Sequence, residues 1–373
     1  MNKILHVVPA LAAGGIENLL LNYSIEGPIY ENFQIDFVTH AKTGLIYETL
    51  LEKGFSVFYV TPKKESIVKN FKETAKVIKN GKYDIVHVHQ TYSSFFTLII
   101  AKIYKVPVRI VHSHTNIKKR NSFLGNMIRI IMRWLCCHFA TDLWSCGLAA
   151  GKYLYGNKKE FYIMPNAISS NKIISNTELS RKKILEKINI DENKTIISQI
   201  GRFTYEKNHE FTIDLIRKIA EIDSNFVFVF AGDGPLKDSI IEKITNLGLL
   251  SKCRFLGNID YIHELLSVSS VTLLPSLFEG FPVTVIEALF NGVPIICSDN
   301  ISKEVELSCL CTRLPYKSEL WVEKIQLYTK IGKKEKENCK KAMLESVYEI
   351  LNARKIIFDK YISLLNERIG KKC

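Results

Sequence analysis

Two glutamates near residue 280 are the residues whose types and spacing most clearly suggest chemistry. Glu279 and Glu287 lie in the segment 275–288, PSLFEGFPVTVIEA. An apolar strand is expected to end before the Gly/Pro turn that holds Glu279, and a short apolar helix is expected to begin near Pro282. A carboxylate in so apolar a run is costly to bury unless it is hydrogen-bonded, so Glu287 is expected to hold hydroxyl groups while the helix start faces an anion. The alternative is a structural capping role for both carboxylates.

A loop with two cations follows another apolar run. Arg202 and Lys207 stand in the segment 201–208, GRFTYEKN, directly after the candidate strand Thr195–Gln199. At the carboxyl end of a strand, two fixed cations could hold a diphosphate without a metal. The alternative is a solvated helix start that carries charges.

The glycine pair Gly14-Gly15 stands between the first candidate strand and a helix expected to begin near Ile16. Such a turn lets backbone N–H groups and a helix N-terminus approach a phosphate, although a glycine pair can also be merely structural. The G-x-G-x-x-G fingerprint is absent, which argues against a dinucleotide-binding fold.

Four histidines alternate at two strand ends: His87 with His89, and His112 with His114. Alternation places each pair on one face of its strand. The imidazoles could bind a metal, as in a metal-dependent hydrolase, could form hydrogen bonds as neutral rings, or could simply pack. A zinc or di-metal site would need further ordered ligands on later strands, which the sequence does not supply.

The chain contains a scaffold that can bring such strand ends together. Short β-branched runs alternate with longer amphipathic segments, a pattern typical of parallel strands connected by helices. The alternation breaks around Pro165–Asn176, restarts, and ends in one long helical tract over 335–369. We therefore expect two Rossmann-like doubly wound domains at 1–165 and 166–345, and a C-terminal helix at 346–373 that crosses back to the first. Ligands of such sheets bind at the carboxyl ends of the strands, here in the cleft between the domains.

The composition is that of a folded globular protein, with 47% hydrophobic and 24% charged residues among 373. These values exclude disordered and fibrous classes. The net charge is +13, and residues 1–165 carry 21 basic against 11 acidic groups. The first domain is therefore expected to meet an anionic partner.

Cysteine usage and hydropathy predict a cytoplasmic protein. The nine cysteines are an odd number without a C-x-x-C pair, so neither a disulfide framework nor a zinc ribbon is expected. His6 and Pro9 interrupt the apolar start, so a cleaved signal peptide is not expected. No run of 18 residues lacks a charge or polar break, so no transmembrane helix is expected.

The motifs together resemble a known family. Glu279-x7-Glu287, the loop 201–208, the segments AGDGP at 231–235 and GGIE at 14–17, and Pro165-Asn166 resemble the retaining GT-B glycosyltransferases of the fourth sequence family. The likeness spans nearly the whole chain and is greatest to bacterial capsular and exopolysaccharide enzymes. It implies the GT-B fold, with an acceptor-binding first domain and a nucleotide-sugar-binding second domain.

The resemblance also implies residue roles. Glu287 would contact the ribose and Glu279 the transferred sugar. Arg202 and Lys207 would neutralise the departing diphosphate, and His114 would face the donor sugar near the reacting carbon. The implied catalytic residues are His114, Glu279, Arg202 and Lys207, and the implied donor-binding residues are Gly14, Gly15, Arg202, Lys207, Glu279, Gly280, Phe281, Pro282, Val283 and Glu287.

The activity implied is retaining, metal-independent hexosyl transfer from a nucleotide sugar, with UDP favoured, to a lipid-linked cell-surface polysaccharide acceptor. Cations and helix N-termini aimed at a departing diphosphate stabilise the transition state more than the ground state, so neither a metal nor another cofactor is expected. Phe281-Pro282 replaces the Phe-Gly of many members, so the donor's identity does not carry over.

The segment 118–139 is the candidate contact with an anionic membrane. Lys118-Lys119-Arg120 precede an apolar helix, Leu124–Phe139, which is interrupted by Arg129 and Arg133. Such a helix suits a peripheral position on the inner face of the cell membrane, or it is a core helix whose two arginines snorkel outward. The other function considered is a metal-dependent hydrolase built on His87, His89, His112 and His114. A nucleic-acid partner is not expected, because no arginine-rich arm, zinc finger or aromatic RNA-binding signature is present.

Overall fold

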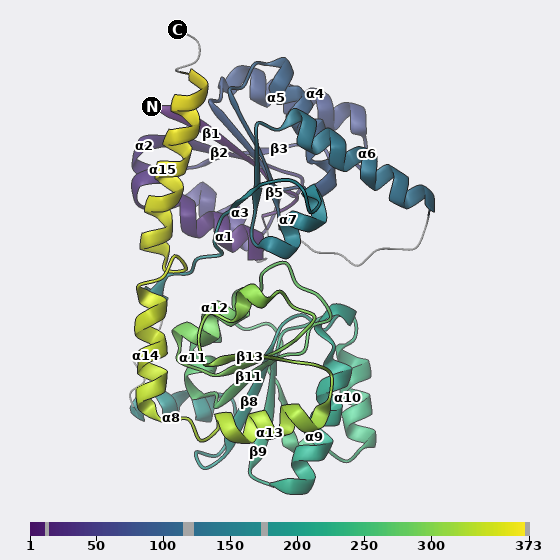
Figure 1. The fold of residues 1–373 in the computed structure, drawn as a ribbon, viewed down its shortest axis with the longest axis vertical. Helices are drawn as coiled ribbons and strands as arrows, with labels where there is room; N and C mark the ends of the chain where they lie inside the picture. Colours follow the sequence, from purple (N-terminus) through teal and green to yellow (C-terminus); the bar gives the residue numbers. More distant parts are fainter. Residues whose placement is uncertain (12–14, 115–122, 173–177, 370–373) are drawn as a thin grey trace. The chain divides into compact units, whose positions relative to one another are not determined.

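The computed structural model describes residues 1–11, 15–114, 123–172 and 178–369. The chain forms two compact units, one made of residues 1–168 with 347–373 and the other of residues 169–346. Figure 1 shows that each unit is a twisted sheet covered by helices. The sequence analysis places the boundaries after residues 165 and 345.

Unit 1 contains a seven-stranded sheet, all of whose pairings are parallel. In spatial order its strands are β3 (Ser56–Tyr59), β2 (Phe33–Thr39), β1 (Asn2–Val7), β4 (Ile85–Val88), β5 (Val108–Ser113), β6 (Asp142–Ser145) and β7 (Tyr162–Ile163). The order reverses between β1 and β4, where the connections leave in opposite directions. That switch point is where an open α/β sheet binds its ligand.

Both faces of the unit 1 sheet are buried, because alternate side chains of each strand enter different cores. Leu5 and Val7 face one core, which is covered by α4 (Ile67–Gly81), α5 (Ser94–Ile103), α6 (Phe123–Phe139) and α7 (Leu148–Tyr155). Ile4 faces the other, which is covered by α1 (Gly15–Ser24), α2 (Pro28–Asn32), α3 (Leu45–Glu52) and α15 (Ile350–Ile369). The helix α15 thus packs on the first sheet although it ends the described chain (Figure 1).

Unit 2 repeats this plan with six parallel strands. Their spatial order is β10 (Cys253–Phe255), β9 (Phe226–Ala231), β8 (Thr195–Ile200), β11 (Val271–Leu274), β12 (Ile295–Ser298) and β13 (Cys311–Leu314), and the switch point lies between β8 and β11. One face carries α9 (His209–Ile222), α10 (Lys237–Asn246) and α13 (Ser318–Tyr328). The remaining helices, α8 (Glu178–Lys187), α11 (Ile262–Val268), α12 (Val283–Phe290) and α14 (Lys333–Leu344), contact one another. The predicted fold class, two Rossmann-like doubly wound sheets, is confirmed.

The expectation of one continuous helix over 335–369 is wrong. α14 ends at Leu344 and α15 begins at Ile350. Between them the backbone pairs with another segment: Ile168 N–H donates to Tyr348 O at 3.0 Å, and Ile350 N–H donates to Ile168 O at 2.9 Å. The chain leaves unit 1 after Ile168 and re-enters it at Val347, so these bonds join the two crossing segments and prevent the helix from continuing.

Candidate active site

The two loops at the switch point of unit 2 hold the predicted cations and one of the glutamates. The loop after β8 contains Arg202 and Lys207, and the loop after β11 contains Glu279. Lys207 Nζ lies 2.6 Å from Glu279 Oε1, and the two side chains are only 19% and 16% exposed. A backbone bond from Leu277 N–H to Glu206 O, 2.8 Å long, joins the same two loops. The ion pair therefore bridges the position where a doubly wound sheet binds its ligand.

Glycines allow the loops to approach this closely. Gly201 has φ +153°, and a Cβ there would lie 3.1 Å from Lys207 Cε, so the lysine side chain lies across a position without a side chain. Gly232, after β9, has φ +140°, and a Cβ would lie 2.1 Å from Gly201 O. Both positions combine a left-handed φ with a close backbone or side-chain neighbour, which only glycine accommodates. The glycines thus fix the path of the cationic loop.

The second glutamate lies in the helix that follows. α12 begins at Val283 after the buried Pro282, and Glu287 is partly buried within it. The preceding segment is fixed by Tyr316, whose hydroxyl donates to Ser276 O at 2.9 Å and to Pro275 O at 3.1 Å. The first N–H groups of α12 therefore lie next to the turn that carries Glu279, and that this helix start faces an anion remains a prediction.

The other residues predicted to bind the donor differ in exposure and in the unit to which they belong. Arg202 is exposed and forms no ion pair within the described part of the chain, whereas Phe281 is buried. Gly15 begins α1, in unit 1. Gly14 lies outside the described residues.

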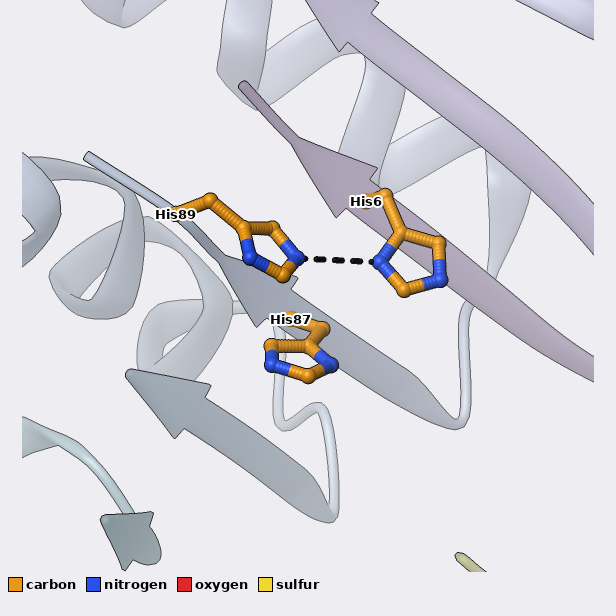
Figure 2. A group of neighbouring side chains, drawn as sticks. All are labelled: His6, His87 and His89. Carbon is orange, nitrogen blue, oxygen red and sulfur yellow. Dashed lines mark hydrogen bonds between the residues drawn. The ribbon is translucent and has the colours of Figure 1, made fainter. Parts of the chain in front are cut away.

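Five histidines gather at the switch point of unit 1, at the ends of three neighbouring strands. His87 and His89 lie at the end of β4, His112 and His114 at the end of β5, and His6 is added from β1. Figure 2 shows the rings of His6, His87 and His89 facing one another, with a hydrogen bond between His6 and His89. His87 and His89 stack with 4.2 Å between centroids, and His112 and His114 stack at 3.9 Å.

Burial keeps these imidazoles neutral. It lowers the pKa of His6 and of His114 to about 3. It also lowers the pKa of His87, His89 and His112 well below the usual value, with neighbouring imidazoles adding to the effect. Except for His114, which is partly exposed, the rings are at most 4% exposed. Charging any of the four buried rings would place a cation in an apolar core.

Most of the ring nitrogens pair with one another. His6 Nδ1 is 3.1 Å from His89 Nε2, and His89 Nδ1 is 2.8 Å from His114 Nε2. A second series joins the Tyr361 hydroxyl to His87 Nδ1 at 2.8 Å and His87 Nε2 to His112 Nδ1 at 3.1 Å. His112 Nε2 is buried without a hydrogen-bond partner in the described chain.

Two overlapping groups of these rings could hold a metal. Nitrogens of His6, His87 and His89, and those of His89, His112 and His114, lie within 4.8 Å of one another. Imidazole suits zinc, copper or nickel. A bound ion would, however, have to replace hydrogen bonds that His89 already makes with both of its ring nitrogens. The pairing therefore favours the neutral hydrogen-bonding role among the three that the sequence left open.

Sequence reasoning missed two members of this arrangement, His6 and Tyr361. His6 pairs in register with His87 across β1 and β4, a contact that depends on a strand order not visible in a local pattern. Tyr361 comes from α15, 274 positions from His87. A histidine near the end of each of three strands was the signal that could have revealed His6.

The helix α6 presents an apolar face to solvent. Ile130 is 62% exposed and Trp134 is 61% exposed, and Met127 and Ile131, also exposed, complete the face. Arg133 lies on the protein side, where its Nε donates to Leu154 O at 3.1 Å. In the alternative of a core helix both arginines would reach outward, and Arg133 does not, because the Leu154 carbonyl of α7 accepts from its guanidinium. Lys118, Lys119 and Arg120 lie outside the described residues.

Two doubly wound parallel sheets in one chain, with a lysine–glutamate pair at the switch point of the second, define a protein of the GT-B class. A crystal structure of Anabaena Alr3699/HepE in complex with UDP and glucose has the same fold: the TM-score is 0.82 at 17% identity, over 97% of this chain and 100% of that one. The family model for glycosyl transferases group 1 matches residues 180–309, and that for Glycosyltransferase Family 4 matches residues 13–147.

Two curated relatives extend this match. "Putative glycosyltransferase EpsF" of Bacillus subtilis (strain 168) is 31% identical over 93% of either chain. The UDP-Gal:alpha-D-GlcNAc-diphosphoundecaprenol alpha-1,3-galactosyltransferase of Escherichia coli is 27% identical over 75% of either chain. The chain therefore belongs to the glycosyltransferase family that includes EpsF and that the two family models describe. Both relatives are named as glycosyltransferases, and the hydrogen bonds among the histidines do not favour the metal site that the hydrolase alternative needs.

Proposed function

We propose that the protein is a retaining glycosyltransferase that moves a hexose from a UDP-sugar to a lipid-linked saccharide during assembly of a capsular polysaccharide or exopolysaccharide. The observation that carries this proposal is the Lys207–Glu279 pair at the switch point of unit 2, with the exposed Arg202 on the same loop. The names of the relatives support the substrates: one solved structure holds UDP and glucose, and the Escherichia coli enzyme uses UDP-Gal and a diphosphoundecaprenol acceptor.

In the proposed reaction the bond from the anomeric carbon to the donor diphosphate breaks, and the bonding electrons leave with the diphosphate. Lys207 and Arg202 stabilise the charge that develops on it, which is why no metal ion and no other cofactor is required. The acceptor hydroxyl attacks from the face that the diphosphate leaves, and the diphosphate accepts the hydroxyl proton. Glu279 binds the transferred sugar and Glu287 the ribose.

The family resemblance assigns further donor contacts to residues of each unit. The segment Gly280-Phe281-Pro282-Val283 and the start of α12 contribute backbone N–H groups. Gly15 contacts the donor phosphates, and His114 faces the transferred sugar. A neutral His114 suits this role, because a neutral imidazole can exchange hydrogen bonds with a hydroxyl without competing with Lys207 for the anion.

The first test is nucleotide binding. UDP should raise the melting temperature of the protein equally with and without EDTA, because Arg202 and Lys207 supply the compensating charge. At a hundredfold excess over Kd the stabilisation should be about 2.7 kcal/mol. Differential scanning fluorimetry with UDP and GDP measures it. No shift with either nucleotide, or a shift that EDTA abolishes, would contradict the proposal.

The two glutamates should separate binding from turnover. Glu287→Ala should weaken UDP binding by about 1.5–3 kcal/mol, the value of a hydrogen bond to a charged group. Glu279→Ala should spare UDP binding, because the ammonium of Lys207 then loses its carboxylate partner and is free for the diphosphate, yet turnover should fall. Isothermal titration with UDP distinguishes the variants. Equal affinities in wild type and Glu287→Ala would contradict the ribose assignment.

We also propose that unit 1 docks on an anionic membrane, on the cytoplasmic side, to reach the lipid-linked acceptor. The support is the exposed apolar face of α6, formed by Met127, Ile130, Ile131 and Trp134, together with the positive charge of residues 1–165. An apolar helix face beside basic residues is typical of an interfacial helix. No helix in the described part of the chain is long and apolar enough to cross a membrane.

Vesicle binding tests this docking. Phosphatidylglycerol vesicles should sediment the wild type at low salt, neutral vesicles should not, and binding should weaken with salt, because attraction acts over a Debye length of about 8 Å at physiological ionic strength. Changing Lys118, Lys119 and Arg120 together to Ser should weaken binding about 100-fold, at about 1 kcal/mol per residue.

An apolar double variant and a control complete the vesicle experiment. Ile130→Ser with Trp134→Ser should also release the protein from the vesicles. Leu247→Ser, at a residue of unit 2 that is 50% exposed, should leave binding unchanged. Undiminished sedimentation of both multiple variants would show that α6 does not face the lipid.

A further inference from the structure

Three histidines of unit 1 form one continuous hydrogen-bonded chain. His6 Nδ1 bonds to His89 Nε2 at 3.1 Å, and His89 Nδ1 bonds to His114 Nε2 at 2.8 Å. His89 is 1% exposed and stands in the middle, with one ring nitrogen engaged on each side. Figure 2 shows the His6–His89 link and the ring of His87 beside it.

Neutral rings in such a chain cannot choose their tautomers independently. A neutral imidazole has one N–H donor and one bare nitrogen that accepts. If His6 donates from Nδ1, His89 Nε2 accepts, so the proton of His89 is on Nδ1 and is donated to His114 Nε2. The proton of His114 is then on Nδ1 as well. In the opposite polarity all three protons are on Nε2.

The burial of the two ends decides between these polarities. With all protons on Nδ1, each N–H inside the chain has an acceptor, and the last N–H belongs to His114, the partly exposed ring. With all protons on Nε2, the last N–H belongs to His6, whose ring is only 4% exposed. An N–H at the more exposed end can donate to water or to a ligand and so find the acceptor that every N–H needs, which favours the first polarity.

We propose that His89 is a positioning residue for His114. Through its two hydrogen bonds it fixes the ring orientation and the tautomer of His114, so that Nδ1–H is the group presented to the transferred sugar as a hydrogen-bond donor. This inference rests on the proposed function, in which His114 faces that sugar. His6 donates its Nδ1–H to His89 Nε2 and thereby keeps the proton of His89 on Nδ1, from which His89 donates to His114.

The same strand supplies a matched control. His87 lies two residues before His89, is also buried, and has both ring nitrogens bonded, but to the Tyr361 hydroxyl and to His112. His87→Phe and His89→Phe therefore remove two buried hydrogen bonds each and keep an aromatic ring in the stack. Only the second of them removes the partner of His114.

The test combines tautomer detection with kinetics on the full chain. Long-range ¹H–¹⁵N correlation spectra of protein labelled at histidine should show Nδ1–H for His6, His89 and His114. In His89→Phe the proton of His114 should be distributed over both nitrogens, and in His87→Phe it should remain on Nδ1. With the UDP-sugar donor, kcat of His89→Phe should be about tenfold lower than kcat of His87→Phe, which corresponds to the loss of one hydrogen bond in the transition state. The KM of the two variants should be nearly the same.

A conservative variant separates positioning from packing. His89→Gln should recover part of the lost kcat, because its amide can accept from one neighbour and donate to the other. The proposal is overturned by a proton on Nε2 of His114 in the wild type, by a His114 tautomer that does not respond to His89→Phe, or by equal kcat in the two phenylalanine variants. Zinc that copurifies at one ion per chain and is released by a chelator would also overturn it, because a metal would occupy these nitrogens.

The two proposals fail separately. Absence of a UDP-dependent stabilisation in the wild type would remove the proposed function, while the tautomer spectra would still report on the chain of histidines. A normal UDP response together with an unresponsive His114 would remove only the role of His89.

Discussion

Replacement of Lys207 by alanine is expected to lower kcat by about 100- to 1,000-fold, the usual cost of removing a group that stabilises charge in a transition state. The effect should be this large because Lys207 is only 19% exposed and is fixed by Glu279 and by the loop bonds around it. A preorganised cation needs no rearrangement as the diphosphate leaves. Initial rates with saturating donor and acceptor give kcat.

Two further variants define what Lys207 does. Lys243→Ala removes a lysine that also pairs with a glutamate, Glu210, but at an exposed position on α10, so its rate should match the wild type. Gly201→Ala leaves Lys207 in the sequence but places a methyl group 3.1 Å from its Cε, so it should lose much of the activity by displacing the ammonium. A Lys207→Ala rate within threefold of the wild type, on the order of 0.6 kcal/mol, would mean that the diphosphate binds elsewhere.

Mild acid is expected to unfold unit 1 before unit 2. Burial lowers the pKa of His6, His87, His89 and His112, so the unfolded chain binds more protons than the folded chain once the pH falls below about 6.5. The free energy of unfolding increases with pH wherever the unfolded state binds more protons than the folded state. The free energy of unfolding of unit 1 should therefore decrease as the pH falls, because its buried imidazoles stay neutral. Between pH 7 and pH 5 the burial of His6, whose pKa is lowered to about 3, costs about 2 kcal/mol, and the three other buried imidazoles add to this loss.

Several losses of about 2 kcal/mol are a large share of the whole stability of a typical domain, about 5–15 kcal/mol. Unit 2 offers an internal comparison, since burial there lowers the pKa of His209 to about 4 and its loss should be about 2 kcal/mol. Hydrogen exchange read by mass spectrometry at pH 7, 6 and 5 should show early loss of protection in β4 and β5 and retention in β8 and β9. In His112→Phe, stability should depend less steeply on pH, by about 1.4 kcal/mol per pH unit. Parallel loss of protection in both units would contradict this account.

The sequence was sufficient for the parts of the fold that local patterns determine. Buried parallel strands such as Ile85–Val88 and Phe226–Ala231 are short apolar runs between breaks, which is the pattern from which two doubly wound sheets were predicted. The strand Cys311–Leu314 lacks that apolar signal, because it is an edge strand in which Thr312 and Arg313 are partly exposed. The break at 345–349 was missed for a different reason, since it depends on backbone pairing with Ile168, far away in sequence.

In the candidate site, too, local sequence patterns predicted some features and could not predict others. Strand ends and turn glycines predicted that Lys207 and Glu279 would stand near a common ligand, but not that they would pair with each other. The alternation of His87 with His89 and of His112 with His114 predicted a shared face. Which nitrogens meet depends on strand order and register, so a local pattern could not distinguish metal binding from hydrogen bonding.

Unit 1 is interrupted in the sequence, and this affects the order in which a ribosome can complete the two units. The sheet of unit 1 emerges early, but α15, whose Tyr361 bonds to His87 and stacks on Trp144, is made only after the whole of residues 169–346. At about 5–20 residues per second, the nascent sheet waits on the order of 10–40 s for this helix. During that time unit 2 can become complete first, while the apolar face that α15 will cover remains open to chaperones, proteases and other nascent chains.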